Sequence, residues 1–414
     1  MCVCQLESGE SNSVNKTRLQ EMRSRNPKSD ADGDEILSKS AAPAFMERAQ
    51  TDVHKIKDTD YPRFIEYLKR TGKPPVEYVL DKFKDHDVII LGEMHGVREN
   101  LELIHDLIEP LYHKADVRYL AMEILRHKNT DLVNQLVTGK EYDQQSALRI
   151  FRDYAHPNWG YKEYMNVIRA IWELNNKLPP EAEKFKVVAL DKGDWDAIDL
   201  PAIPSPKNYE EFVNKHDPFM ADVLAQEVLA KGGKALVQIG YMHSFTRYRF
   251  TEKAPRFGYI LHEKYGDRVF QVCLHQPHFG PEVLTGNPPT SHPVIIDFME
   301  KVMSKNANNP VGFDVDNSPF ANLKDSKSLY FASQENAVFS DIAQGYIYIK
   351  PIRHLGKMTW VEGFIDRSNF KRAKTIAEKR GWIAMFEKSG LIKPGECNSP
   401  KGLNRLFKLI TESN

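Results

Sequence analysis

The sequence predicts an α/β fold with a mostly parallel central sheet flanked by helices, and a C-terminal helical region. Two observations support this prediction. Five near-continuous apolar runs suit strands that are buried on both faces of a parallel sheet. The stretches between them carry apolar residues at helical spacing, and strands that alternate with helices are typical of parallel sheets with crossover connections. With 414 residues, the chain is long enough to bury a large core.

Each of the five apolar runs leads into an ionisable side chain. The runs are residues 87–92, 117–122, 185–190, 234–240 and 268–274, and the side chains that follow them are Glu93 with His95, Glu123, Asp191, His243 and His275. A sixth run, residues 345–350, predicts a late strand. The sequence therefore predicts a sheet that has polar groups gathered at the ends of its strands.

The stretches between the runs predict the helices. Apolar residues recur every three or four positions in residues 98–112, 161–178 and 217–231, which is typical of helices that cover a sheet. Further helices are expected near residues 61–68, 76–83, 293–305, 367–386 and 402–411.

Composition divides the chain into three parts. Residues 1–50 are rich in Ser, Asn, Lys, Asp and Glu, and we expect a disordered polar arm there. Residues 51–350 form the predicted α/β domain, with a long excursion at 276–330 that is rich in Pro, Asn, Ser and Gly. Residues 351–414 form the predicted C-terminal helical extension.

Charge and cysteine content restrict the partners and the compartment. Lys and Arg total 57, as do Asp and Glu, so no global field favours nucleic acid as the partner. The four scattered cysteines form neither a disulfide framework nor paired zinc spacing, which favours a reducing, cytoplasmic location. No apolar run is long enough to span a bilayer, and we expect a soluble protein. A lipoprotein that has lost its signal, with Cys2 as the lipidated residue, is a minor alternative. The oligomeric state stays open.

Two motifs with the pattern Gly-x-x-His are the most specific feature of the sequence. They are Gly92-Glu-Met-His95 and Gly240-Tyr-Met-His243, and each follows an apolar run. Ligands in open parallel sheets bind beyond the carboxyl ends of the strands, so two neighbouring strands would bring both histidines together. The candidate catalytic residues are Glu93, His95, Glu123 and His243.

These residue types allow three interpretations. Two imidazoles and several carboxylates suit a divalent metal (Zn, Mn, Co or Fe), with His95, His243, Glu93, Glu123 and Asp191 as candidate ligands. Without a metal, His95 could act as a general base oriented by Glu93 or Glu123, while His243 stabilises negative charge. In the third interpretation, the residues form a buried polar network that fixes the strand ends. The sequence lacks the glycine-rich and serine motifs of P-loop enzymes, dinucleotide enzymes and serine hydrolases.

The stretch Val88–His95 resembles the opening motif of a broad superfamily. Its members are ChaN-like haem-binding proteins, erythromycin esterase-like hydrolases and Tiki-type metalloproteases. The order of the later motifs, through Met122-Glu123, Trp159-Gly-Tyr161, Asp191 and His243, extends the resemblance over residues 60–275. The Glu-x-His spacing is similar to that of the ChaN-like group. The following residues, His95–Glu99, resemble the esterase-like group instead.

The resemblance implies two functions. The first is a hydrolase-like enzyme that acts on an ester, amide or lactone, with a small molecule or a peptide as its substrate. The second is a haem- or metal-binding protein without turnover, in which Tyr241 is the candidate cofactor ligand. An enzyme-like scaffold used for interaction is a third option.

Overall fold

The structure is a computed structural model that describes residues 50–153, 159–193, 206–249, 255–277, 295–332, 334 and 336–413. Residues 1–49 of the predicted polar arm and residues 278–294 of the predicted excursion lie outside the described residues.

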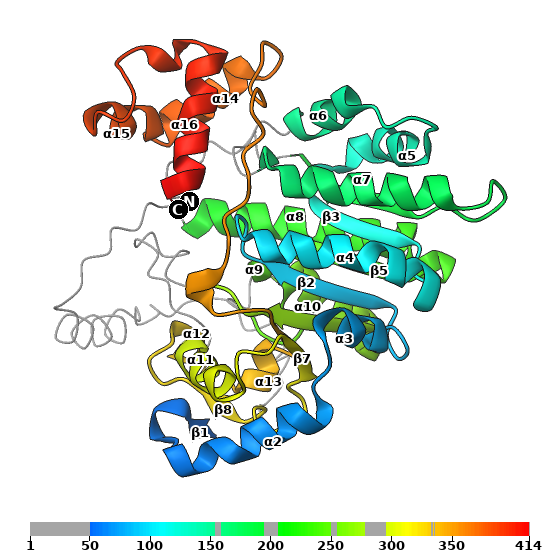
Figure 1. Ribbon diagram of the computed structural model, residues 1–414, viewed down its shortest axis with the longest axis vertical. Coiled ribbons are helices and arrows are strands. Elements are labelled where there is room, and N and C mark those ends of the chain that lie inside the picture. The colour runs from blue at the N-terminus through cyan, green and yellow to red at the C-terminus, as the bar shows by residue number, and fades with distance from the viewer. Residues whose placement is uncertain are drawn as a thin grey trace, which may run out of the picture.

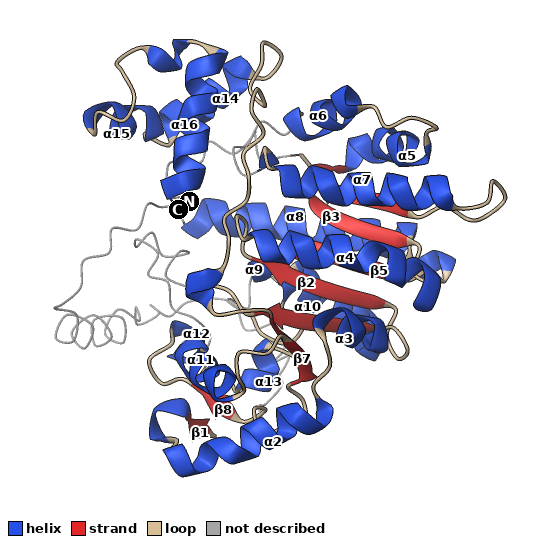
Figure 2. Cartoon of the chain, viewed as in Figure 1, coloured by secondary structure: helices blue, strands red, loops and turns tan. Residues whose placement is uncertain are grey.

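The centre of the molecule is a seven-stranded sheet in the order β4-β3-β5-β2-β6-β9-β7 (Figures 1 and 2). All neighbouring strands run parallel except β7, which pairs antiparallel with β9 at one edge. The predicted mostly parallel sheet is therefore confirmed. The strands are β2 (Val88–Glu93), β3 (Tyr119–Arg126), β4 (Lys186–Asp191), β5 (Ala235–Gly240), β6 (Val269–Leu274), β7 (Val311–Asp314) and β9 (Gly345–Tyr348).

A separate two-stranded sheet joins the start of the described chain to the predicted excursion. It pairs β1 (Thr51–Asp52) with β8 (Leu323–Lys324). Helix α11 confirms the helix predicted near residues 293–305, whereas the strands β7 and β8 in the excursion were not predicted. An Asn-rich turn at residues 306–309 connects α11 directly to the edge strand β7.

Helices cover both faces of the central sheet. Helices α4 and α7 pack against each other on one face, and α8 and α10 pack together on the other (Figure 1). The helices are α2 (Tyr61–Thr71), α3 (Pro75–Lys82), α4 (Arg98–Lys114), α5 (Thr130–Thr138), α6 (Gln144–Arg152), α7 (Lys162–Lys177), α8 (Pro206–Glu227), α9 (Tyr241–Ser244), α10 (Phe257–Tyr265), α11 (Ile296–Lys305), α12 (Leu329–Ala332) and α13 (Phe339–Ile342).

The C-terminal region is helical, as predicted, and ends in α14 (Phe370–Lys379), α15 (Trp382–Lys388) and α16 (Pro400–Ser413). The prediction of one helix over residues 367–386 was wrong. Gly381 has a φ of +68°, a left-handed conformation that ends the first helix and begins the second.

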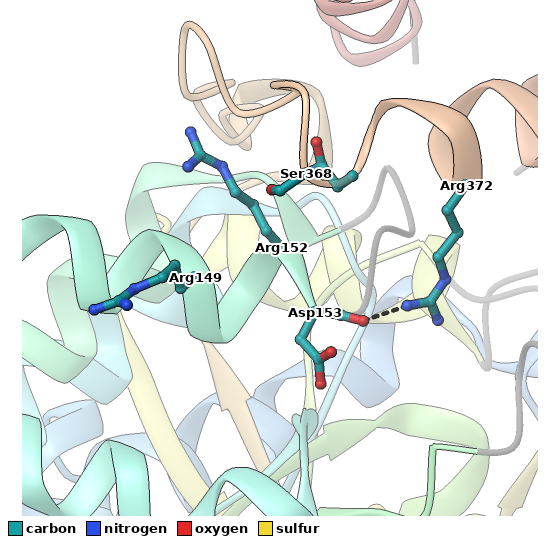
Figure 3. Close-up of a pocket in the computed structure, with 6 residues that line it drawn as sticks. Arg149, Arg152, Asp153, Ser368 and Arg372 are labelled. Carbon is teal, nitrogen blue, oxygen red and sulfur yellow. Dashed lines mark hydrogen bonds between the residues drawn. The ribbon is translucent and has the colours of Figure 1, made fainter.

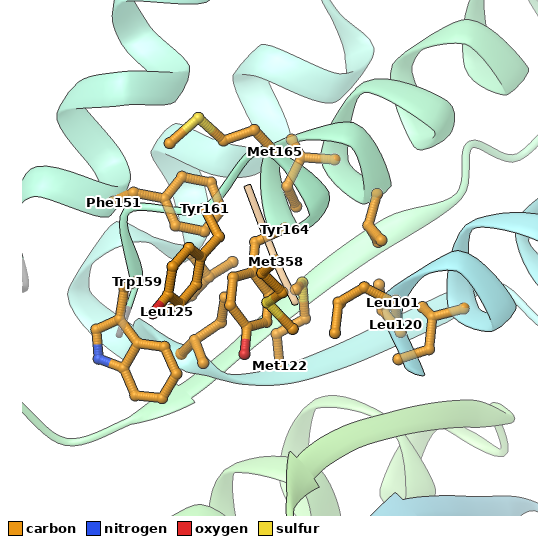
Figure 4. Close-up of a cluster of buried hydrophobic side chains, with 14 of the residues drawn as sticks. Leu101, Leu120, Met122, Leu125, Phe151, Trp159, Tyr161, Tyr164, Met165 and Met358 are labelled. Carbon is orange, nitrogen blue, oxygen red and sulfur yellow. The ribbon is translucent and has the colours of Figure 1, made fainter. Parts of the chain in front are cut away.

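Three apolar clusters hold the layers together. The largest packs α4 and α7 on the sheet, through residues such as Leu101 and Tyr164 (Figure 4). It continues into the C-terminal helices through residues such as Trp382 and Phe407. The second lies around α11, β7 and β9, and the third lies between the sheet and α8 and α10. Among the described helices, none combines the length and the apolar character needed to cross a bilayer.

Candidate functional site

The two Gly-x-x-His motifs meet at a topological switch point of the sheet. Strands β2 and β5 are neighbours, and Glu93 lies opposite Gly240 in their register. The chain leaves β2 for α4 on one face and leaves β5 for α10 on the other face (Figure 1). Adjacent parallel strands whose connections diverge in this way leave a crevice at their carboxyl ends, where α/β proteins bind ligands.

The backbone around His95 depends on two glycines and one glutamine. A Cβ atom on Gly92 would lie 2.4 Å from Ser244 Oγ, so glycine allows α9 to pack on the end of β2. Gly96 has a φ of +103°, which favours glycine at the turn after the histidine. Buried Gln276 accepts a hydrogen bond from Met94 N–H at 2.7 Å and donates one to Gly92 O at 2.8 Å. These contacts fix the position of His95.

His95 and Glu93 form a hydrogen-bonded pair. Nδ1 of His95 lies 2.7 Å from Oε1 of Glu93, whose side chain is fully buried, whereas the His95 side chain is 25 % exposed. The Tyr164 hydroxyl donates to the same carboxylate oxygen at 2.5 Å. Burial alone would lower the pKa of His95, but the hydrogen bond to Glu93 and the charges of Glu93 and Glu123 outweigh it and raise the pKa above the usual value.

Glu123 lies between the two motifs. Its Oε2 accepts a hydrogen bond from Gly240 N–H at 2.5 Å, and its Oε1 lies 3.4 Å from His243 Nε2. An irregular register after Met122 separates the end of β3 from the neighbouring ladder, which allows the side chain to turn toward β5. Burial raises the pKa of Glu123, but His243 and His95 outweigh it, so the pKa is lowered.

Gly240 makes the convergence of the motifs possible. A Cβ atom there would lie 3.1 Å from His95 Nε2 and 3.2 Å from Glu123 Oε2. Since these are tighter than ordinary van der Waals contacts, a larger residue would push the imidazole and the carboxylate away. The structure thus brings Glu93, His95, Glu123 and His243 together at one point.

His243 belongs to a second buried pair. Its Nδ1 lies 2.8 Å from Asp217 Oδ1, and Asp217 also accepts from Phe257 N–H at 2.7 Å. Arg256 lies beside both residues, with Nε 3.5 Å from Asp217 Oδ1 and Nη2 3.3 Å from His243 Nε2. Burial raises the pKa of Asp217, but Arg256 and His243 outweigh it and lower the pKa to about 2.

Asp191 ends β4, the strand beyond β3, and so lies further from the first motif than Glu123 does. It is fully buried, accepts a hydrogen bond from Gly193 N–H, and lies 3.6 Å from Nε2 of His216. Burial and the neighbouring charge of His243 lower the pKa of His216 to about 4. Asp191 therefore extends the polar network through His216.

Tyr241 follows Gly240 but packs inward. It is 5 % exposed and lies in the second apolar cluster, with its ring 6.3 Å from Phe245. Haem is a large ligand, so it would reach this hydroxyl only after that packing had opened. In the described arrangement, Tyr241 does not fit the role of a haem ligand.

The candidate metal ligands do not form a compact set. Across the parts of the chain that the structure describes, no three His, Cys, Asp or Glu side chains are arranged to hold one metal ion. Nδ1 of His95 is already hydrogen-bonded to Glu93, and Nδ1 of His243 is hydrogen-bonded to Asp217. The geometry therefore does not fit a preformed metal centre with the predicted ligands.

His275 ends β6, next to β2, but faces another cluster. Its Nδ1 lies 2.7 Å from the Tyr346 hydroxyl, and its Nε2 lies 2.8 Å from Glu300 Oε1. Burial lowers the pKa of this histidine, and the hydrogen bond and charge of Glu300 oppose the shift without cancelling it. His275 is thus a buried residue outside the site.

Several residues that complete the site were not predicted from the sequence. Tyr164 was interpreted only as part of an apolar helix face, and Asp217 only as the start of a helix. The adjacent polar pair His216-Asp217 within a helix that covers a sheet was a usable signal, because such positions are normally apolar. No local pattern marked the others, which are Arg256 and Gln276.

Comparisons with known proteins agree with the resemblance seen in the sequence. The model of a family described as haem-binding uptake, Tiki superfamily, ChaN matches residues 79–183, which include β2, α4, β3 and α7. This match confirms the predicted similarity to the superfamily. No curated protein matches the chain.

One solved structure shares the fold at low sequence identity, and two others match with lower TM-scores. A succinoglycan biosynthesis protein is 12 % identical, with a TM-score of 0.51, and the match covers 73 % of this chain and 99 % of that one. A mutant erythromycin esterase in its open conformation is 11 % identical, with a TM-score of 0.45 and coverage of 67 % and 96 %. ChaN of Campylobacter jejuni with cofacial haem is 16 % identical, with a TM-score of 0.28 and coverage of 48 % and 85 %.

Proposed function

We propose that this protein is a hydrolase of an ester, amide or lactone, in which His95 acts as a general base. The observation that carries the proposal is the asymmetry of the His95–Glu93 pair. The carboxylate is fully buried and holds Nδ1, while the imidazole is partly open to solvent. A histidine oriented through one nitrogen is able to use its other nitrogen for proton transfer.

In the proposed reaction, Nε2 of His95 removes a proton from water while the water oxygen bonds to the carbonyl carbon of the substrate. The proton then passes from His95 to the leaving oxygen or nitrogen as its bond to carbon breaks. Glu93 stabilises the positive charge on the imidazole between these steps. His243, held through Nδ1 by Asp217 and next to Arg256, stabilises negative charge on the carbonyl oxygen.

The test compares wild type with His95→Ala on a panel of aryl esters, lactones and amides. We expect hydrolysis by the wild type and a loss of about 10²–10⁴-fold in the variant, the range for a general base. His105→Ala is the matched control, since that side chain is 48 % exposed on α4 and is hydrogen-bonded to Asp106 rather than to a residue of the site. Hydrolysis that survives His95→Ala would refute the role of His95.

Haem binding without turnover is the second candidate, because the matching family model carries that description. The test is titration of haem into the protein while a Soret band is monitored, with wild type beside Tyr241→Phe and His95→Ala. A band that either substitution abolishes would favour the haem-binding function. Elemental analysis of the same samples would decide whether a divalent metal accompanies the site.

A further inference from the structure

The first part of the C-terminal region crosses the site-bearing edge of the α/β domain. Figure 1 shows this segment, in orange, running past α4 and α7 before it reaches α14. Residues 356–361, which we call the strap, make antiparallel backbone bridges to two loops: Lys357 pairs with Val97, and Trp360 pairs with Tyr161. The strap therefore touches the two loops that surround His95.

The first of these loops follows His95 directly. Met358 N–H donates to Gly96 O at 3.1 Å, and Arg98 N–H donates to Gly356 O at 2.9 Å. Gly96 is the next residue after His95, so the strap holds the backbone on one side of the imidazole. Gln276 holds the other side, through Gly92 and Met94.

The second loop carries Trp159, an aromatic side chain that contacts His95. Trp159 packs edge-on against the imidazole, with 4.7 Å between ring centroids. The strap binds the residues that follow: Val361 N–H donates to Gly160 O at 2.8 Å, and Lys162 N–H donates to Thr359 O at 2.9 Å. A Cβ atom on Gly160 would lie 2.6 Å from the Trp360 ring, so this contact requires glycine.

Two buried glutamates hold the strap in place. Both carboxylate oxygens of Glu99 accept from Gly356 N–H, at 3.0 and 2.8 Å, and both oxygens of Glu163 accept from Thr359 N–H, at 3.1 and 2.9 Å. Glu99 lies in the first turn of α4 and Glu163 in the first turn of α7, where the helix dipole also favours negative charge. Lys350 lies 2.5 Å from Glu99 and compensates its charge.

Apolar packing holds the strap itself, and two arginines hold the chain that follows it. Figure 4 shows Met358 among Tyr161, Tyr164 and Trp159 in the largest apolar cluster. Figure 3 shows a cleft between α6 and the chain that enters α14, where Arg372 donates to Asp153 O. Arg152, from the same cleft, donates to Gly363 O and Phe364 O at 2.9 and 2.8 Å.

From these contacts we propose that the strap is part of the candidate active site, and that Glu99 and Glu163 are positioning residues that act on His95 through Gly96 and on Trp159 through Gly160. Neither glutamate is proposed to touch the substrate. The geometric part of the inference stands on the contacts above. Its consequence for turnover rests on the proposed hydrolase function.

The experiment uses the full chain with Glu99→Gln and Glu163→Gln combined. Glutamine keeps the shape of the glutamate side chain but has one acceptor oxygen instead of two. Each backbone N–H therefore loses one of the two oxygens that accept from it. Hydrogen exchange followed by mass spectrometry should show at least about tenfold faster exchange in peptides covering residues 94–98 and 159–162, since the opening of these loops becomes easier. The kcat for ester hydrolysis should fall by about 10- to 100-fold with little change in KM, as expected for a misplaced base.

The matched control is Glu396→Gln. Glu396 accepts from Arg405 at 2.7 Å within the C-terminal helices, so its loss loosens that region without touching the strap. Exchange in that variant should rise near residues 391–405 only, with kcat unchanged. If the double variant does not fold, each single variant is measured in its place.

Two outcomes would overturn the inference: unchanged exchange at residues 94–98 and 159–162 in the glutamate variants, or equal effects in the Glu396→Gln control. A wild type that hydrolyses nothing would refute the proposed hydrolase instead. The exchange measurement would still decide whether the strap positions the loops.

Discussion

Two histidines end neighbouring parallel strands and are both hydrogen-bonded to a glutamate, yet their surroundings differ. His95, after β2, uses one ring nitrogen on Glu93 and is 25 % exposed. His275, after β6, uses both ring nitrogens, on Tyr346 and Glu300, and its side chain is 0 % exposed. The pKa is raised for His95 and lowered for His275.

The difference shows what separates a candidate site from a structural contact at a strand end. His275 has both nitrogens hydrogen-bonded and no exposed side-chain surface, so it is able to bind neither water nor substrate. His95 has one nitrogen held by Glu93 and a partly exposed side chain, which orients its other nitrogen for proton transfer. Exposure and the number of occupied nitrogens therefore separate the two residues, whereas their positions after apolar strands do not.

The largest effect is expected at the deepest pair, His243 with Asp217. Asp217→Asn removes a charge that lies among His243 and Arg256, and it leaves the buried guanidinium without its carboxylate. Breaking a buried ion pair in this way lowers the free energy of unfolding by about 3–5 kcal/mol. Urea denaturation would measure the loss. A change below about 1 kcal/mol would mean that Arg256 finds compensation elsewhere.

The second prediction compares Glu93, which is hydrogen-bonded to His95, with Glu300, which is hydrogen-bonded to His275. Glu93→Gln weakens the orientation and charge stabilisation of His95, and we expect kcat to fall about 10²-fold, within the range for acid–base catalysis. Glu300→Gln alters a cluster outside the site and should leave kcat within about twofold, because Glu300 contacts His275 and Ile352 rather than a residue that holds His95. Initial rates of ester hydrolysis measure both variants. Equal losses would show that the contrast between the two histidines has no catalytic meaning.

Much of the site could be predicted because it depends on the strand pattern. Apolar runs fixed the strands, and Gly92 and Gly240 marked their ends, so the meeting of His95, Glu123 and His243 required only that β2 and β5 be neighbours. Residues that join the site from helices or loops carry no such pattern. Asp217 and Arg256 come close only because α8 and the chain before α10 pack on the same face of the sheet.

The errors in the fold prediction have similar causes. The edge strand β7 was missed because it is short and follows an Asn-rich turn, and its pairing with β9 is a tertiary contact. The predicted helix over residues 367–386 concealed a break, because apolar spacing continues through Gly381 while the backbone there is left-handed. The contact of the strap with the His95 loop joins residues about 260 positions apart, as between Arg98 and Lys357, and no local signal encodes it.

The third prediction concerns stability at the structural histidine. His275→Ala leaves the buried Tyr346 hydroxyl without its partner and removes one of the hydrogen bonds of Glu300. Unpaired buried polar groups cost about 1–3 kcal/mol, so the free energy of unfolding should fall by this amount while ester hydrolysis is retained. Thermal unfolding beside an activity assay tests both parts. Loss of hydrolysis in a folded His275→Ala protein would place this histidine in the active site and remove the basis of the comparison.

The smallest effect is a difference in how stability depends on pH. The pKa of His95 is raised on folding, so its contribution is complete below the ordinary value of 6.5 and is lost as pH rises through the folded pKa. The pKa of His275 is lowered, so the native state loses stability as pH falls from 6.5 toward the folded pKa. His95→Gln should therefore cost most stability near pH 5, and His275→Gln most near pH 8. Denaturation midpoints between these pH values measure the two slopes, and slopes of the same sign would contradict the opposite environments of the two histidines.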